Sequence, residues 1–416
     1  SGLNVAVGYQ AGTAVSTGVQ NTLIGASAGV ALAAGAGNVA VGFEALKTED
    51  GHGTATAIGF QALKTLNAGA DSFNVAVGYQ AAEAMTTGKR NTAMGANALD
   101  TATDGDDNVA IGYDAGTAIT TASDNTLVGA YAGTALNTGT ANVAVGFEAL
   151  KTEDANGESV AIGYQALKTQ NAGASGLNVA VGYQAGTAVT TGVKNVIVGA
   201  SAGVAINSGD FNTALGYEAL AATTDRNSNT GIGAQTLKTN VNGAKNTAVG
   251  SGALLTMNPA TDSDTFNTAV GFDAGNDITT GKQNTLVGGL AADALTTGTN
   301  NVAMGYLALS TETAGDNSVA IGRSALGTQN VATGGNVYNT AVGHSAGGAV
   351  TTGVQNTLIG SLAGDALTNA DFNVAVGYAA LSADTLGSRS VAIGRNTLEN
   401  QNFTTATDTF NTADLP

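Results

Sequence analysis

One five-residue motif recurs from one end of the chain to the other, and it constrains the fold more than any other feature. The motif reads Asn, then Val or Thr, then usually Ala, then a bulky apolar residue, then Gly, as in residues 4–8 and 21–25. It occurs 23 times in 416 residues, and most successive glycines are 17 residues apart. A fixed period of this length is typical of a solenoid, in which each repeat forms one turn of the chain.

The repeats are in phase from Gly8 to Gly394, and a truncated copy occupies residues 411–414. Four intervals are longer, at 19 or 21 residues, and the 17-residue spacing resumes after each. We expect the additional residues to form loops on one side of the stack. Length alone would favour several globular domains, but this pattern predicts one continuous array over residues 1–416, with about 23 turns.

The motif itself predicts a short strand. Val and Thr are β-branched and favour extended backbone, so the sequence predicts an all-β parallel solenoid, or β-roll. Side chains alternate between the two faces of a strand. The residue before Gly is always bulky and apolar, as at Val7, Ile24 and Ile162, and we predict that it points inward. On this assignment Ile162→Asp would cost several kcal/mol because it buries an unpaired charge.

The middle residue of the strand is Ala in 17 copies and is expected on the opposite face. Both faces would then be apolar, which indicates that the second face is covered as well. The expected partner is another copy of the same chain, in a homo-oligomer.

Polar and aromatic residues also recur in fixed columns. Asn opens 19 of the 23 copies, which predicts a ladder of stacked amides along the solenoid. An aromatic residue follows the Gly in 12 copies, often with a small residue in the next turn, and we expect this alternation to relieve crowding between rings. Two interpretations are open for the aromatic residues that precede Asn: exposed contact residues or, as we expect, hydrophobic plugs that cover the longer turns. These residues are Phe73, Phe211, Phe266, Tyr338, Phe372 and Phe410.

Composition excludes several classes of function. The net charge is −17, which offers no electrostatic footprint for nucleic acid. There is no Cys, so disulfides and thiolate metal sites are absent. No apolar run approaches the ~18 residues of a membrane span. The two histidines are isolated: His344 takes the aromatic position of its turn, and His52 lies in a predicted exposed loop. We therefore predict no enzyme activity, no catalytic or metal site and no cofactor.

Two ligand hypotheses compete with a purely structural interpretation. Acidic loops supply the oxygen ligands that Ca²⁺ prefers, although their spacing matches no complete calcium loop and solvated turns are the simpler interpretation. These loops contain Asp104, Asp106 and Asp107, Asp262 and Asp264, and Glu153 and Asp154. A flat array of Thr on a solenoid can also order ice. Thr fills the first strand position in 11 of 23 copies, irregularly, and is expected to face inward.

These columns resemble the YadA-type head repeats of trimeric autotransporter adhesins, where an Asn- or Ser-led Val-Ala-Ile-Gly strand recurs. Residues 159–163 and 318–322 are examples in this chain. Similar repeats occur in fibre proteins of bacteriophages and marine bacteria. The resemblance covers residues 4–398 and implies a left-handed β-roll with three chains about one axis. The 17-residue turn looks longer than the usual head turn, and the sequence has no heptad stalk or membrane-anchor barrel.

The leading hypothesis is a non-enzymatic extracellular or cell-surface fibre or adhesin segment. Its function would be rigid reach and multivalent contact with a host surface, glycan or matrix. The alternatives are a phage tail-fibre shaft on a virion or a self-assembling bacterial filament, and a monomeric solenoid that binds ice or calcium. Because the chain opens in mid-repeat without Met, we expect it to be a segment of a longer protein.

Overall fold

Short parallel strands joined by turns make up the whole described chain. The structure is a computed structural model and describes residues 2–155, 157–173 and 175–414. Within these residues there are strands and turns but no helix. Two units are distinguished, Ser1–Asp210 (unit 1) and Phe211–Pro416 (unit 2). Each contains twelve strands of three residues, which gives about 24 turns and confirms a parallel β-solenoid with a 17-residue spacing. That the repeats form one uninterrupted array stays a prediction.

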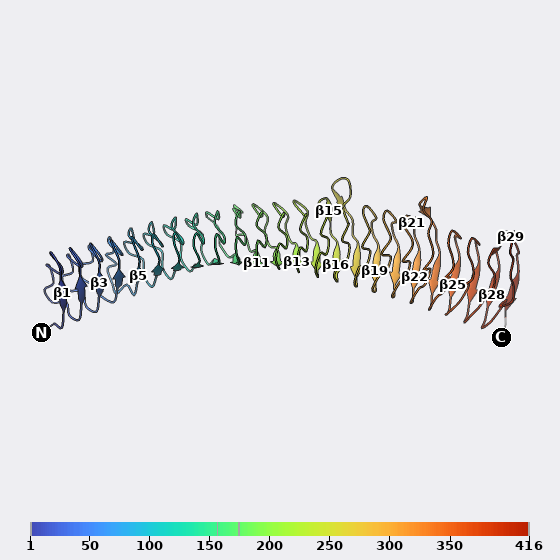
Figure 1. Cartoon of the computed structure of the whole chain (residues 1–416), viewed down its shortest axis with the longest axis horizontal. Helices are drawn as coiled ribbons and strands as arrows, with labels where there is room; N and C mark the ends of the chain where they lie inside the picture. Colours follow the sequence, from blue (N-terminus) through green and yellow to red (C-terminus); the bar gives the residue numbers. More distant parts are fainter. Residues whose placement is uncertain (1, 156, 174, 415–416) are drawn as a thin grey trace. The chain divides into compact units, whose positions relative to one another are not determined.

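In unit 1 every strand begins at the Val or Thr of a motif and ends at the residue before Gly. Successive strands pair in parallel, so that Val5 lies opposite Thr22 and Val39 opposite Thr56. Register survives the 19-residue turns, because Thr56 still lies opposite Val75. Figure 1 shows these strands as a row of arrows, one per turn. The strands are β1 (Val5–Val7), β2 (Thr22–Ile24), β3 (Val39–Val41), β4 (Thr56–Ile58), β5 (Val75–Val77), β6 (Thr92–Met94), β7 (Val109–Ile111), β8 (Thr126–Val128), β9 (Val143–Val145), β10 (Val160–Ile162), β11 (Val179–Val181) and β12 (Val196–Val198).

Unit 2 repeats this arrangement, and its 21-residue turns keep the register, with Thr247 opposite Thr268. The truncated copy forms the last strand, which pairs with the strand before it. The main strands are β13 (Thr213–Leu215), β14 (Thr230–Ile232), β16 (Thr247–Val249), β18 (Thr268–Val270), β19 (Thr285–Val287), β20 (Val302–Met304), β22 (Val319–Ile321), β24 (Thr340–Val342), β25 (Thr357–Ile359), β26 (Val374–Val376), β28 (Val391–Ile393) and β30 (Thr412–Asp414).

The longer turns of unit 2 are ordered by three small two-stranded sheets. Each pairs a two-residue strand with its counterpart in the next turn, in parallel. The pairs are β15 (Gly243–Ala244) with β17 (Ser263–Asp264), β21 (Gly315–Asp316) with β23 (Gly335–Asn336), and β27 (Gly387–Ser388) with β29 (Thr407–Asp408).

The predicted assignment of the strand faces is wrong. In β10 the middle residue, Ala161, is completely buried, whereas Ile162 keeps 38% of its surface exposed. The same pattern, with a buried middle residue between two more exposed neighbours, holds in the three-residue strands from β2 to β28. The reason is the narrow cross-section of a 17-residue turn. Its interior accepts a small strand residue because larger side chains from the opposite wall fill the space, among them Leu46, Leu63 and Met85.

A large residue in the middle of a strand is matched by a small residue on the opposite wall of the interior. Where the strand carries Leu23 in its middle, the fourth residue after the corner glycine is Gly, at Gly29 in the same turn and Gly12 in the previous one. A Cβ at Gly12 would lie 2.6 Å from a methyl group of Leu23, and one at Gly29 2.8 Å. Leu127 stands between Gly116 and Gly133 in the same way. The summed volume of the side chains from the two walls therefore stays about the same from turn to turn.

Two features fix the stacking of the turns, namely the corner glycines and a ladder of Asn side chains. At the corner, Gly8 has a φ of +135°, and a Cβ there would lie 2.6 Å from the carbonyl oxygen of Gly25 in the next turn, so this column requires Gly. The predicted Asn ladder is confirmed. The backbone N–H of Asn38 donates to Oδ1 of Asn21 at 2.9 Å, and Nδ2 of Asn21 donates to the carbonyl of Gly35 at 2.8 Å.

Candidate functional site

The strand residues that flank the buried middle position form the outward face of each unit. We use "outward face" for the first and third strand positions together with the residue that follows the corner glycine. Val, Thr, Ile and Met dominate its strand positions, and Ile24, Ile58 and Met94 are each about 40% exposed. Monomeric soluble proteins rarely expose a contiguous apolar surface larger than a few hundred Å². The outward face is therefore the principal candidate for an interaction surface.

Aromatic rings line one border of the outward face, and in unit 1 they stack directly on one another. The ring centroids of Phe43 and Phe60 are 5.3 Å apart, and those of Phe60 and Tyr79 are 5.2 Å apart with nearly parallel planes. A second stack joins Phe147, Tyr164 and Tyr183. The expectation that rings alternate with small residues is wrong for these turns. A ring that lies face to face with its neighbours takes up little more space along the stack than the ~4.8 Å spacing of neighbouring strands.

The aromatic residues that precede Asn are also exposed, so the prediction that they are plugs is wrong. Phe73, Phe266, Tyr338, Phe372 and Phe410 each have at least two fifths of their surface in solvent. Two of them instead contact cations of the outer surface: the Arg389 guanidinium lies 4.6 Å from the ring centre of Phe372, and Lys245 Nζ lies 5.1 Å from that of Phe266.

Most acidic residues considered for calcium pair with cations or threonines of a neighbouring turn. Arg90 contacts both Asp106 and Asp107, at 3.1 and 2.6 Å, and the guanidinium lowers the pKa of Asp107. Asp104 accepts hydrogen bonds from Thr86 and Thr87. In unit 2, Asp262 pairs with Arg226 at 2.8 Å and Asp264 with Lys245 at 2.6 Å. Asp104, Asp106, Asp107 and Asp264 connect successive turns, whereas the pair of Asp262 and Arg226 spans two turns.

Glu153, expected in a solvated loop, is instead completely buried. Its Oε2 accepts a hydrogen bond from Gln170, which also donates to Ser159 and accepts from Asn178. Gln170 thereby replaces the amide that Ser159 lacks in the Asn ladder. The same set recurs at Glu312, Ser318, Gln329 and Asn339, and at Asp384, Ser390, Gln401 and Asn411.

The sequence carries a signal for this network, although the Asn column alone does not predict it. Each Ser that opens a copy has an acid six residues before it and a Gln eleven residues after it, as with Glu312, Ser318 and Gln329. The buried acid also holds the loop, because Oε1 of Glu312 accepts the N–H groups of Thr313, Ala314 and Gly315.

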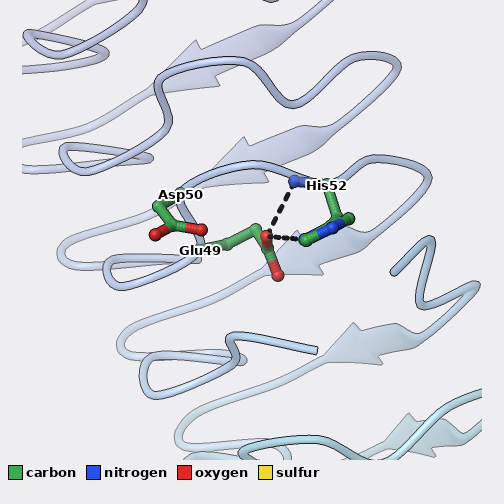
Figure 2. A group of neighbouring side chains, drawn as sticks. All are labelled: Glu49, Asp50 and His52. Atoms are coloured by element: carbon green, nitrogen blue, oxygen red, sulfur yellow. Dashed lines mark hydrogen bonds and ion pairs between the residues drawn. The ribbon is translucent and has the colours of Figure 1, made fainter. Parts of the chain in front are cut away.

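Among the described residues, one group of potential metal ligands comes close together, and it contains Glu49, Asp50 and His52. Glu49 precedes Ala55 by six residues and so occupies the same position as Glu153 and Glu312. It is 1% exposed. Its Oε1 accepts the His52 N–H at 2.9 Å and lies 3.5 Å from His52 Nδ1, and its Oε2 accepts the Ala68 N–H at 3.3 Å. Figure 2 shows both Oε1 contacts running to His52, with the Asp50 side chain apart from them.

These contacts make Glu49 the acid of a loop cap, because both of its oxygens already accept N–H groups. His52 is partly exposed and is held by its backbone. His344, the other histidine, follows the corner glycine Gly343 on the border of the outward face. The two histidines lie in different units.

Charged ladders run along a further surface, formed by the second and fifth residues after each corner glycine. In unit 1, Glu148 lies 2.6 Å from both Lys151 of its own turn and Lys168 of the next. Together with Gln165 these ammonium groups lower the pKa of Glu148 to about 2. Lys64 similarly pairs with Glu83 at 3.0 Å and Glu44 at 3.7 Å.

No protein-family model matches this chain, and no curated protein sequence is significantly similar to it. The described residues contain no helix that is long and apolar enough to span a membrane.

Proposed function

We propose that this chain is a segment of a non-enzymatic structural fibre whose outward face packs against other copies of the same chain. The observation that carries the proposal is the outward face itself, with its continuous columns of Val, Ile and Met beside exposed aromatic rings. Burial stabilises by roughly 25 cal/mol per Å² of apolar surface, and this contribution is repeated in every turn. A repeating surface of this kind favours a partner with the same repeat.

The interior of each turn supports a mechanical function. Within each unit, backbone hydrogen bonds and the corner glycines link successive turns, and the Asn ladder adds to them except where Ala55 interrupts it, so stability grows approximately as the sum of the turns. The residues that the sequence offers for chemistry, Glu49, His52 and Glu153, hold loops and ladders through hydrogen bonds.

The resemblance to YadA-type head repeats supplies the finer part of the proposal. It favours three chains about one axis, a left-handed coil, and an extracellular location in which the fibre presents many weak contacts to a host surface, glycan or matrix. A phage tail-fibre shaft or a bacterial filament would use the same packing. Electron microscopy of the native assembly distinguishes these, because a filament grows end to end whereas an adhesin head has a fixed length.

Sedimentation equilibrium tests the central claim. We expect the mass of three chains, and we expect a double variant of the outward face, Ile58→Lys with Met94→Lys, to shift the mass toward one chain while far-UV circular dichroism stays unchanged. Both side chains are about two fifths exposed, so the fold of a turn tolerates the change. A wild-type chain that remains monomeric at high micromolar concentration would refute self-packing.

Ice binding is a second candidate, favoured by one specific observation. The Thr column, expected to face inward, lies on the outward face. Five consecutive strands of unit 2 place Thr in direct register. These residues are Thr213, Thr230, Thr247, Thr268 and Thr285. Their hydroxyl and methyl groups repeat at the strand spacing of about 4.8 Å. Thermal hysteresis that disappears in Thr247→Lys would support this function, and its absence in the wild type would exclude it.

A further inference from the structure

Two tyrosine rings of unit 1 face each other on successive turns. Tyr164 and Tyr183 each follow a corner glycine and are 19 residues apart in the sequence. Their ring centroids lie 5.3 Å apart, and the angle between the ring planes is 8°, so the rings are stacked. The other stacked pairs described above contain at least one Phe. This pair therefore brings two phenol groups together in a parallel arrangement.

The backbone holds the two rings next to each other. Strands β10 and β11, which precede them, pair in parallel with Ile162 opposite Val181. Beyond the strands, the N–H of Gln184 donates to the carbonyl oxygen of Tyr164 at 2.8 Å. The two side chains therefore begin at neighbouring backbone positions that stay together as long as the turns are stacked. Such preorganisation makes a reaction between two groups effectively unimolecular.

Both rings are accessible from solvent in the chain. Tyr164 keeps 42% of its surface exposed, and Tyr183 keeps 54%. Phe147, in the preceding turn, stacks on Tyr164 with a centroid distance of 5.5 Å, whereas the turn after Tyr183 carries the small residue Ala200 in the same column. Tyr164 is thus confined between two rings, and Tyr183 has room to rotate against it. An oxidant in solution can reach both phenols.

We propose that Tyr164 and Tyr183 form an oxidative cross-linking site, at which the two side chains couple to dityrosine. The oxidant is hydrogen peroxide, used by a separate peroxidase. The stacked geometry carries the proposal, because coupling needs two phenoxyl radicals side by side before either is reduced again. The bond would connect two turns of one chain and close the loop between them, which lowers the conformational entropy of the unfolded chain.

The reaction balances with one peroxide for each cross-link. Each phenol loses one electron and one proton and becomes a phenoxyl radical, and the peroxide takes up both electrons and both protons and becomes two molecules of water. The two radicals then form a carbon–carbon bond between the Cε atoms next to their oxygens. The hydrogen on each of these Cε atoms moves to the oxygen of its own ring as a proton, which restores both phenols.

Peptide mapping tests the proposal. The full chain is treated with a haem peroxidase and hydrogen peroxide at low micromolar protein concentration, then denatured and digested with trypsin. Because trypsin cleaves after Lys and Arg, Tyr164 falls in peptide 152–168 and Tyr183 in peptide 169–194. We expect mass spectrometry to find these two peptides joined, with the loss of two hydrogen atoms, in protein that migrates as a single chain on a denaturing gel.

Three variants complete the test. Tyr164→Phe and Tyr183→Phe each keep a ring in the stack and remove one phenol, so each should abolish the joined peptides. Tyr131→Phe is the matched control. Tyr131 also contacts a tyrosine, Tyr113, with centroids 5.4 Å apart, but the two rings meet edge to face at 82°. Both lie in the single tryptic peptide 91–151, and this variant should leave the joined peptides unchanged.

The proposal fails if the joined peptides are absent, if they occur only in covalent multimers of the chain, or if they are no more abundant than links to a distant tyrosine such as Tyr306. The same oxidation of the double variant Ile58→Lys with Met94→Lys keeps this result separate from the proposed self-packing. Joined peptides in this variant alone would support the site and show that association covers it. Their absence from both proteins would overturn the cross-link and leave self-packing intact.

Discussion

The turns around Glu148 in unit 1 and the turns between Leu307 and Asp365 in unit 2 have the same interior but different outer surfaces. Around Glu148 the second and fifth columns are filled by Glu and Lys in contact, and stacked rings lie on the border of the outward face. In the turns of Ser324 and Ser345, between Leu307 and Asp365, the same columns carry Ser and Gly and leave a groove.

What does not change between the two regions is the interior. The Asn ladder has the same geometry in both units: the N–H of Asn108 donates to Asn91 at 2.9 Å, and the N–H of Asn301 donates to Asn284 at 2.9 Å. The framework therefore determines the fold, and the outer columns are free to diverge toward different surfaces. On this interpretation the two units are alike inside and different outside, and variants of matched positions distinguish the two.

The largest effect should come from a charge in the buried strand column, and it should be equal in the two units. Ala161 and Ala303 are both completely buried, so Ala161→Asp and Ala303→Asp should each lower the free energy of unfolding by about 3 kcal/mol or more. Chemical denaturation measures the loss.

The matched controls are the adjacent outward residues, Ile162 and Met304, which are 38% and 40% exposed. Ile162→Asp and Met304→Asp should change the stability of the chain by less than about 1 kcal/mol, and any larger effect should appear as lost association. An Asp at position 162 that unfolds the chain while Asp at position 161 does not would reverse the assignment of the faces.

The assignment of the strand faces is the point at which prediction from the sequence failed. Period, strand position, parallel register and the Asn ladder all follow from which residue types recur. Alternation separates two faces of a strand but does not say which is inside, because that depends on the cross-section of the coil. The exchange between Leu23 and the pair Gly12 and Gly29 contained the answer, since only residues that touch need to compensate in volume. The groove was beyond prediction, because it arises from side chains that are missing in neighbouring turns.

The second effect concerns the ladder. Asn108 and Asn284 each accept the N–H of the next Asn and donate to a backbone carbonyl. Replacing either with Ala leaves buried groups unsatisfied, and we expect a loss of about 2–4 kcal/mol in both units. Thermal denaturation followed by circular dichroism measures it. Ser should rescue little at position 284, because Leu295 stands where Gln329 supports Ser318. Full rescue by Ser would show that the ladder needs no amide.

The third effect should differ between the units. Phe60 stacks on both Phe43 and Tyr79, whereas Tyr306 stands between Gly289 and Arg323 in its column. Since an aromatic pair is worth about 0.5–1.5 kcal/mol beyond its buried area, Phe60→Leu should cost about 1–2 kcal/mol more than Tyr306→Leu. Chemical denaturation of the two variants gives the difference. Equal losses would mean that stacking adds nothing to the stability of unit 1.

The smallest effect is a pH dependence of opposite sign in the two regions. The pKa of Glu148 is lowered to about 2, so its native state binds fewer protons than the unfolded chain. The stability that Glu148 contributes is therefore complete above its ordinary pKa of 4.5 and is lost as the pH falls toward 2. Burial raises the pKa of Asp365 above 3.8, so its native state binds more protons, and stability there decreases as the pH rises through that raised value.

Hydrogen exchange read by peptide mass spectrometry resolves the two regions, once the intrinsic exchange rates have been corrected for pH. On acidification, amides next to Glu148 should lose protection while amides next to Asp365 gain it, each by less than about 1 kcal/mol because both groups are partly screened by solvent. Glu148→Gln should flatten the first response and Asp365→Asn the second. If both regions respond to pH in the same direction, the different side chains in the second and fifth columns do not change the pH dependence of local stability. The two surfaces would then differ in shape alone.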